Sequence, residues 1–186
     1  GDAAEDVGSA DWSPDGASLA VVRAPQWRYR LEFPAGKVLY ETTGYISHPR
    51  VSPKGDAVAF LDHPVLGDDR GSVAIVDLAG KKKTLSGESA QGLAWSVPGK
   101  EIWFTATRAG NARSVYAVTP AGRERAVLTT PAGLLLQDIS RDGRVLLVQS
   151  NARVGFYAVL SGETRERDLS GLEWSWGPRL SEDEKA

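Results

Sequence analysis

The sequence predicts an all-β fold: a β-propeller segment of four four-stranded blades, followed by the first strand of a fifth. Three observations predict it. A serine that ends one strand-like run and opens a tight turn recurs at intervals of about 40 residues, the spacing of propeller repeats. Glycines follow these turns in a regular series, and no stretch has the sustained 3.6-residue periodicity of a helix. The five serines are Ser13, Ser52, Ser96, Ser140 and Ser181.

Each repeat is predicted to hold four short strands, named A to D in chain order. They lie at 9–12, 18–22, 28–33 and 37–42 in blade one (9–42); at 46–51, 57–61, 72–77 and 82–85 in blade two (46–85); at 91–95, 101–105, 114–118 and 124–128 in blade three (91–128); and at 135–139, 144–148, 155–159 and 164–169 in blade four (135–169). A last A strand at 173–180 stands alone, and we expect the single domain 1–186 to be part of a larger ring.

Two independent series of turns support these strands. A tight hairpin needs a residue with positive φ, which glycine adopts without a Cβ clash. The A–B turns contain Gly16, Gly55, Gly99 and Gly143, and the C–D turns end in Gly36, Gly80, Gly122 and Gly162.

Several B strands are apolar at every position, as at 19–22, 58–61 and 145–148. A blade lies between two neighbours, so we expect both faces of its middle strands to be buried. The D strands are more polar, as at 81–83 and 165–168, which fits an outer rim whose charge opposes edge-to-edge association.

Composition excludes several classes of function. The chain has 186 residues and a formal net charge of −2, so no nucleic-acid binding is expected. No apolar run approaches the roughly 20 residues of a membrane helix, and no membrane insertion by this segment is expected. Cysteine is absent, which excludes disulfides and thiolate metal sites. Methionine is absent too, and we expect the chain to be processed or a piece of a longer protein.

The run ADWSPDGASLA at 10–20 resembles the repeat of TolB-type, WD40-like bacterial β-propellers. VSPKG at 51–55 and WSVPG at 95–99 are close variants, ISRDG at 139–143 loses the proline, and LSEDE at 180–184 lacks the glycine. The resemblance implies a non-catalytic module for protein–protein interaction or ligand sensing, and it favours a periplasmic or extracytoplasmic location in a bacterium.

A narrower resemblance covers 44–85, where HPRVSPKG and LDHP look like the propeller region that follows the kinase domain in some bacterial serine/threonine kinases. No glycine-rich phosphate loop and no His-Arg-Asp catalytic loop is present, so kinase activity is not implied. An alternative is an accessory propeller of a prolyl-oligopeptidase-type peptidase whose catalytic domain lies outside this chain. GESAQG at 87–92 misses the Gly-x-Ser-x-Gly elbow by one residue, and we predict no catalytic residues.

The candidate binding residues lie two positions before each serine, on the innermost strand of each blade. They are Asp11, Arg50, Ala94, Asp138 and Arg179, and the four charged ones are predicted to line the central channel. Two interpretations stay open. Asp11 with Arg50, and Asp138 with Arg179, could form ion pairs between blades; alternatively, the column forms a polar funnel that binds a ligand or peptide.

The tryptophans divide into two groups. Trp12 and Trp95 occupy the same repeat position, one before the serine, which predicts packing between blades, and Trp103 in a B strand is interpreted in the same way. Trp27, Trp174 and Trp176 lie outside that position and are candidate anchors for a partner.

No cofactor or metal is predicted. Acidic residues (Asp62, Asp68 and Asp69) lie near His63, but ordinary hydrogen bonding is the preferred interpretation of both His48 and His63. The expected partner is a protein or peptide, and the apolar faces of the end blades predict self-association.

Overall fold

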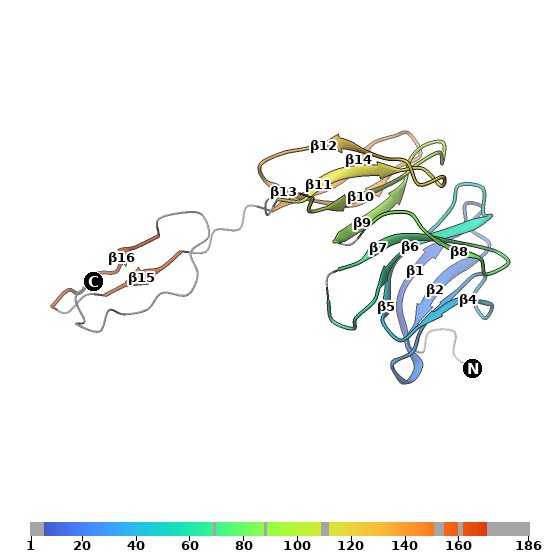
Figure 1. Cartoon of the computed structure of the whole chain (residues 1–186), viewed down its shortest axis with the longest axis horizontal. Coiled ribbons are helices and arrows are strands. Elements are labelled where there is room, and N and C mark those ends of the chain that lie inside the picture. Colours follow the sequence, from blue (N-terminus) through green and yellow to red (C-terminus); the bar gives the residue numbers. More distant parts are fainter. Residues whose placement is uncertain are drawn as a thin grey trace. The chain divides into compact units, whose positions relative to one another are not determined.

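The computed structural model describes residues 6–68, 70–87, 89–108, 112–150, 155–159 and 162–170. Over these ranges the regular secondary structure is β-strand, apart from one short 3-10 turn at Pro25–Trp27 (Figure 1). This confirms the predicted all-β propeller fold. No helix in the described ranges has the length and apolar character needed to cross a bilayer. The chain divides into two compact units, Gly1–Ser150 and Asn151–Ala186, where the sequence predicts one domain.

Three four-stranded antiparallel sheets lie where the sequence predicts blades one to three (Figure 1). In each sheet every strand pairs with the next one in the chain, the arrangement of a propeller blade. The strands are β1 (Val7–Trp12), β2 (Leu19–Arg23), β3 (Tyr29–Glu32) and β4 (Val38–Thr42) in blade one; β5 (Tyr45–Val51), β6 (Ala57–His63), β7 (Ser72–Asp77) and β8 (Lys82–Thr84) in blade two; and β9 (Ala90–Trp95), β10 (Ile102–Ala106), β11 (Ser114–Val118) and β12 (Glu124–Leu128) in blade three.

At 135–169, where the sequence predicts a four-stranded blade four, the structure describes two hairpins, one in each unit. In the first unit β13 (Gly133–Ile139) pairs with β14 (Val145–Ser150), and in the second unit β15 (Tyr157–Ala158) pairs with β16 (Arg167–Asp168). Within the described residues, each hairpin forms a two-stranded sheet in its own unit. The β15–β16 hairpin is paired at only two positions, so its strand ladder is short. The predicted strand 173–180 lies outside the described residues.

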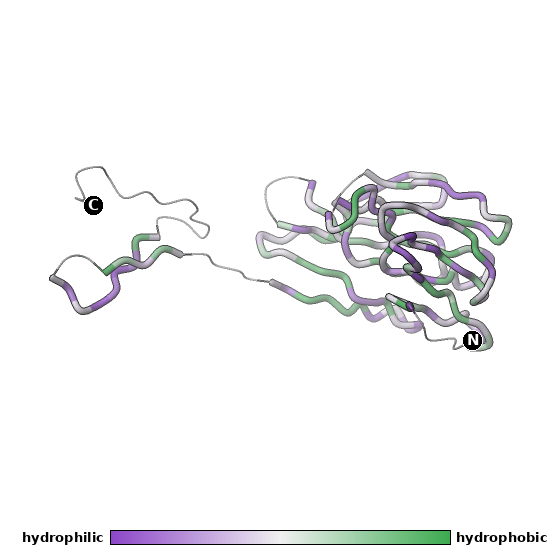
Figure 2. Tube along the Cα trace, turned by 90° about the horizontal axis from the view of Figure 1, so that it is seen from below, coloured by the Kyte–Doolittle hydropathy of each residue, from purple (hydrophilic) through white to green (hydrophobic). Residues whose placement is uncertain are grey.

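The core consists of side chains packed between successive blades, and β6 shows how the sequence builds it. Val58 and Phe60 belong to the cluster shared with blade one, whereas Ala59 and Leu61 belong to the cluster shared with blade three. Successive residues of a strand point to opposite faces, so an uninterrupted apolar run fills both interfaces. Figure 2 shows hydrophobic stretches interspersed with hydrophilic ones along the chain.

The apolar run 145–148 does not follow this pattern, and the prediction that both of its faces are buried is wrong. Leu146 is 60% exposed and Val148 is 47% exposed. The run lies on β14, which belongs to a two-stranded sheet, whereas β6 is an inner strand of a four-stranded one.

The recurring serine holds the A–B turn together. The Ser13 carbonyl accepts a hydrogen bond from the Gly16 amide at 2.8 Å, and the Ser13 hydroxyl accepts one from the Ser18 amide at 2.9 Å. The turn at Ser140 repeats both bonds, with the Gly143 amide at 2.9 Å and the Arg144 amide at 3.1 Å. The serine hydroxyl thus gives a backbone amide a hydrogen-bond acceptor at a position where the strand ladder ends.

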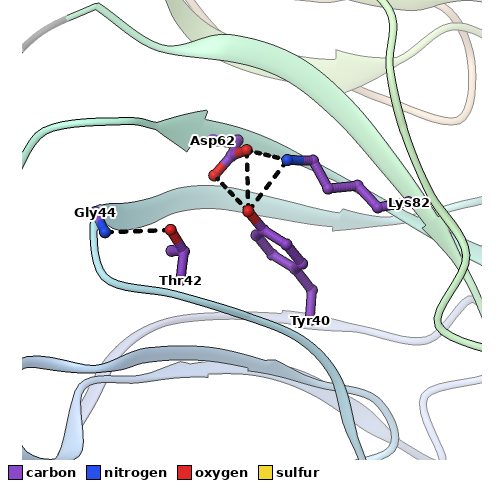
Figure 3. Close-up of polar contacts among 5 residues, drawn as sticks. All are labelled: Tyr40, Thr42, Gly44, Asp62 and Lys82. Atoms are coloured by element: carbon purple, nitrogen blue, oxygen red, sulfur yellow. Dashed lines mark hydrogen bonds and ion pairs between the residues drawn. The ribbon is translucent and has the colours of Figure 1, made fainter.

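A polar cluster links blade one to blade two (Figure 3). Tyr40 on β4 donates its hydroxyl to the Asp62 carboxylate on β6, with oxygen–oxygen distances of 3.2 and 3.3 Å. Lys82 on β8 donates to the Tyr40 hydroxyl at 3.1 Å and also to Asp62. In the connection between these blades, the Gly44 amide donates to Thr42 Oγ1 at 3.1 Å. The three clustered side chains therefore join the outer strand of one blade to the next blade.

Candidate functional site

The inner strands of the first unit, β1, β5, β9 and β13, meet at the ends where each runs into its serine turn. They enclose an open cavity of about 480 Å³, called the mouth below. Its lining combines four charged side chains, two indoles, three prolines and small apolar groups. The residues are Asp11, Trp12, Pro14, Arg50, Val51, Pro53, Trp95, Ser96, Val97, Pro98, Asp138, Ile139 and Arg141.

Three of the four charged residues predicted from the repeat meet at the mouth. Asp11, Arg50 and Asp138 all line it, although the first and last are 127 positions apart in the chain. Ala94, the uncharged member of the series, is buried. Arg179 lies outside the described residues, so its predicted pairing with Asp138 stays a prediction.

Asp11 joins blade one to blade two. Its carboxylate accepts a hydrogen bond from the Val51 amide at 2.7 Å. Burial raises the pKa of Asp11 above its ordinary value of 3.8, and the nearby Asp138 adds to this, although the Val51 amide and the Arg50 charge oppose it. Asp11 is therefore a carboxyl group whose ionised form is costly in the folded chain.

Arg50 is held by main-chain carbonyls rather than by a direct ion pair with Asp11. It donates to the Gln137 carbonyl of β13 at 3.1 Å and to the Pro49 carbonyl at 3.3 Å. Its buried Nε has no hydrogen-bond partner among the described residues. The predicted Asp11–Arg50 pairing thus exists as an electrostatic attraction, while the hydrogen bonds of both groups tie neighbouring backbones together.

Asp138 has a different environment from Asp11. Its side chain is exposed, and it accepts a hydrogen bond from the amide of the next residue, Ile139, at 2.8 Å. In the described ranges no lysine or arginine side chain pairs with it. Of the two carboxylates at the mouth, Asp138 is the one open to a ligand.

Arg141 is a lining residue that the sequence reasoning missed. Its guanidinium donates to the Pro14 carbonyl at 3.0 Å, which links the A–B turns of blades four and one. Its place in the repeat could have indicated this role. Arg141 follows Ser140 at the position that Pro14 and Pro53 occupy in blades one and two.

Trp12 and Trp95 differ despite their shared repeat position. Trp95 is partly buried in the core between blades two and three and donates to the Arg50 carbonyl at 3.0 Å, as the packing prediction requires. Trp12 is 62% exposed at the mouth, so the same prediction is wrong for it. The indole of Trp95 packs toward the preceding blade.

The candidate anchors lie elsewhere. Trp27 is 76% exposed in the B–C turn of blade one and does not line the mouth. Its φ of +64° and that of Gln26, +50°, are unusual for residues with a Cβ. Trp174 and Trp176 lie outside the described residues.

The two histidines belong to a hydrogen-bonded group in blade two. His63 is buried, stacks on Tyr45 with ring centroids 3.7 Å apart, and has its Nε2 2.8 Å from Ser47 Oγ. His48 Nδ1 lies 2.9 Å from the same hydroxyl, and burial lowers the pKa of His48. No cluster of three or more potential metal ligands occurs in the described ranges, and neither histidine lines the mouth.

Comparison with known proteins identifies the fold. No family model matches the sequence, and no curated protein does. Among solved structures, TolB from Acinetobacter baumannii is similar with a TM-score of 0.61 at 21% identity, over 88% of this chain and 43% of that one. A TolB homologue from Agrobacterium tumefaciens gives 0.62 at 19% identity, over 88% and 66%. A prolyl endopeptidase gives 0.59 at 18% identity, over 90% and 30%.

The chain therefore has a TolB-like β-propeller fold and spans less than two thirds of each of these structures. At such identities the likeness shows the fold alone. The narrower resemblance to a kinase-associated propeller has no support among these structures.

Proposed function

We propose that this chain is part of a non-catalytic propeller that binds a protein or peptide segment at the mouth. The observation that carries this proposal is the mouth itself, where an exposed indole, three prolines and an open carboxylate face one cavity of about 480 Å³. That volume lies in the range of binding sites for small molecules and short peptide segments. Tryptophan exposed beside a concavity is a common anchor for a partner.

The chemistry of the lining favours binding over catalysis. A hydrolytic site needs a nucleophile within hydrogen-bond reach of a base. Ser96 lines the mouth, but its hydroxyl accepts the Glu101 amide within its own turn, and no histidine is among the lining residues. The two arginines are engaged with backbone carbonyls. These groups can hold a segment in place without activating a bond.

A second candidate is an accessory propeller of a prolyl-oligopeptidase-type peptidase. The similarity to a prolyl endopeptidase favours it, because the matched part is 30% of that chain. In this role the mouth would control passage toward a catalytic domain rather than retain a ligand.

NMR of the tryptophan side chains tests the proposal. The ¹⁵N-labelled chain is titrated with end-blocked pentapeptides Ala-Pro-X-Pro-Ala, in which X covers acidic, basic, apolar and polar residues. We expect at least one peptide to shift the indole signals of Trp12 and Trp95, while Trp27 and Trp103, which do not line the mouth, serve as internal controls. Absence of binding at millimolar peptide would contradict the proposal and favour the gating role. Shifts confined to Trp27 would place the binding surface elsewhere.

A further inference from the structure

We propose that the mouth selects a peptide segment by a cationic side chain, lysine or arginine, held between the Asp138 carboxylate and the Trp12 ring. This inference rests on the proposed function and names the chemistry of its ligand. It follows from which charges at the mouth are already engaged and which are not.

Three of the four charged groups have cross-blade hydrogen bonds. Asp11 accepts the Val51 amide, Arg50 donates to the Gln137 carbonyl, and Arg141 donates to the Pro14 carbonyl. Asp138 accepts the amide of the residue beside it, at 2.8 Å, and its side chain remains exposed to the cavity. Within the described part of the chain, its negative charge lacks an ion-pair partner, and a ligand cation would supply one.

Trp12 offers the second contact. It lines the same cavity as Asp138 and is 62% exposed. Cations bind preferentially over the face of an indole, and arginine and lysine are the cationic side chains of a peptide. Pro14, Pro53 and Pro98 add apolar surface for the aliphatic stem that both side chains carry. An indole face, a carboxylate and an apolar wall together match a lysine or arginine better than a compact inorganic cation.

A second carboxylate strengthens the preference for a cation. Asp11 also lines the mouth, and its ionised form is disfavoured mainly by burial, to which the charge of Asp138 adds, while the Val51 amide and the Arg50 charge oppose both. A ligand cation would relieve this repulsion, because it attracts both carboxylates. The Arg50 guanidinium attracts Asp11, and its two terminal nitrogens donate to the Pro49 and Gln137 carbonyls within the protein.

Four matched probes test the selectivity: Ala-Pro-X-Pro-Ala, end-blocked, with lysine, arginine, norleucine or glutamate at X. Norleucine copies the lysine stem without its charge. We expect the lysine and arginine peptides to bind about tenfold more tightly than the norleucine peptide, the effect of one open ion pair and one cation–π contact. The indole shift of Trp12 reports the binding site. Affinity should fall with added salt, as for other open ion pairs.

Matched variants separate charge at this site from net charge. Asp138→Asn should remove most of the preference for lysine over norleucine. Asp77→Asn removes the same charge from an exposed C–D turn, where the amide oxygen can still accept the Ala79 and Lys81 amides, and should leave the preference unchanged. Trp12→Ala should weaken binding of the lysine peptide. Trp27→Ala, at an exposed tryptophan outside the mouth, should leave this binding unchanged.

The outcomes distinguish the two proposals. If norleucine binds as tightly as lysine, or glutamate binds most tightly, the charge inference fails while peptide binding at the mouth stands. If propylamine alone shifts the Trp12 signal as strongly as the lysine peptide at equal concentration, the site binds a free amine and the proposed selection of a peptide segment fails. If no probe binds, both proposals fail.

Discussion

At the scale of single residues, Asp11 contributes to binding chemistry and to the fold at once. Its carboxylate holds the Val51 amide of the next blade, yet burial and the neighbouring Asp138 disfavour its charge. Asn at this position would keep an acceptor for the amide and remove the titration. The substitution therefore isolates the electrostatic cost from the hydrogen bond.

Asp11→Asn should change how stability depends on pH. The folded-state pKa of Asp11 lies above its ordinary value of 3.8. Between these two pKa values the folded chain keeps a proton that the unfolded chain has lost. The contribution of Asp11 to stability therefore falls as pH rises from 3.8 through the raised pKa. Urea denaturation from about pH 3.5 to about pH 6.5 should show that wild type loses stability relative to Asp11→Asn over this window.

The comparison must be made as a difference, because Asp15, Glu41 and Glu101 have lowered pKa values and contribute the opposite slope to both proteins. A difference that stays flat with pH, or that Asp77→Asn reproduces, would contradict the assignment.

At the scale of elements, the A–B turns pack on one another as well as closing their own hairpins. A Cβ added at Gly99 would lie 3.0 Å from Cγ and 3.1 Å from Cδ of Pro53, in the turn of the preceding blade. The Gly143 turn has no atom within 4 Å of that position. Both glycines have φ near +85°, at +85° and +86°. They are therefore a matched pair that separates backbone strain from contact between blades.

Gly99→Ala should destabilise the chain more than Gly143→Ala does. Each substitution costs about 1 kcal/mol for placing alanine in the left-handed region. Gly99→Ala adds about 1 kcal/mol or more because the new methyl group overpacks Pro53. Urea denaturation measures both values, and Pro53→Ala should remove the additional cost of Gly99→Ala. Equal costs for the two glycines would show that the turns do not pack together.

The cluster of Tyr40, Asp62 and Lys82 provides a second connection between elements, from β4 to β6 and β8 (Figure 3). Lys82 also lies over the Tyr40 ring, 4.5 Å from its centroid. Burial lowers the pKa of Lys82, but the hydrogen bonds to Asp62 and Tyr40 outweigh this, so the pKa is above its ordinary value. The charged form of Lys82 is therefore the one the fold prefers.

Lys82→Met should cost more stability than Tyr40→Phe, because it leaves the half-buried Asp62 charge without its cation. We expect about 2 kcal/mol for Lys82→Met and about 1 kcal/mol for Tyr40→Phe, measured by urea denaturation at pH 7. Asp62→Asn in the Lys82→Met background should recover part of the loss. A cost for Lys82→Met no larger than for Lys83→Met, at the neighbouring exposed lysine, would contradict this role.

At the scale of the whole molecule, local signals in the sequence predicted the fold well. The glycines at 16, 55, 99 and 143 all have positive φ, and the strands fall close to their predicted ranges in blades one to three. Turn chemistry and strand length depend on neighbours in the chain, so one sequence suffices to find them.

Features that depend on which blades become neighbours were harder to predict. Asp11, Arg50 and Asp138 share one repeat position and line one mouth, because a repeat position maps to a ring position. The exposure of Trp12 and the bond from Arg141 to Pro14 were missed. The repeat pattern treats all blades as equivalent, whereas packing depends on what lies beside each one.

The exposed apolar residues of β14 predict that the isolated chain self-associates. Leu146 and Val148 are 60% and 47% exposed, and apolar surface of this kind promotes association. Sedimentation velocity from micromolar to near-millimolar protein should show an average mass that rises with concentration. Leu146→Glu with Val148→Glu should abolish this rise, because two like charges on each copy would face each other across the contact.

The matched control is Val65→Glu with Leu66→Glu, at a similarly exposed apolar pair in the B–C loop of blade two rather than on a strand. It should leave association unchanged, because its charges lie outside the proposed contact. A chain that stays monomeric at every concentration, or a control that disrupts association equally, would overturn a specific contact through β14. The peptide experiments at the mouth need this result first, since association of the chain would compete with added peptide if the two surfaces overlap.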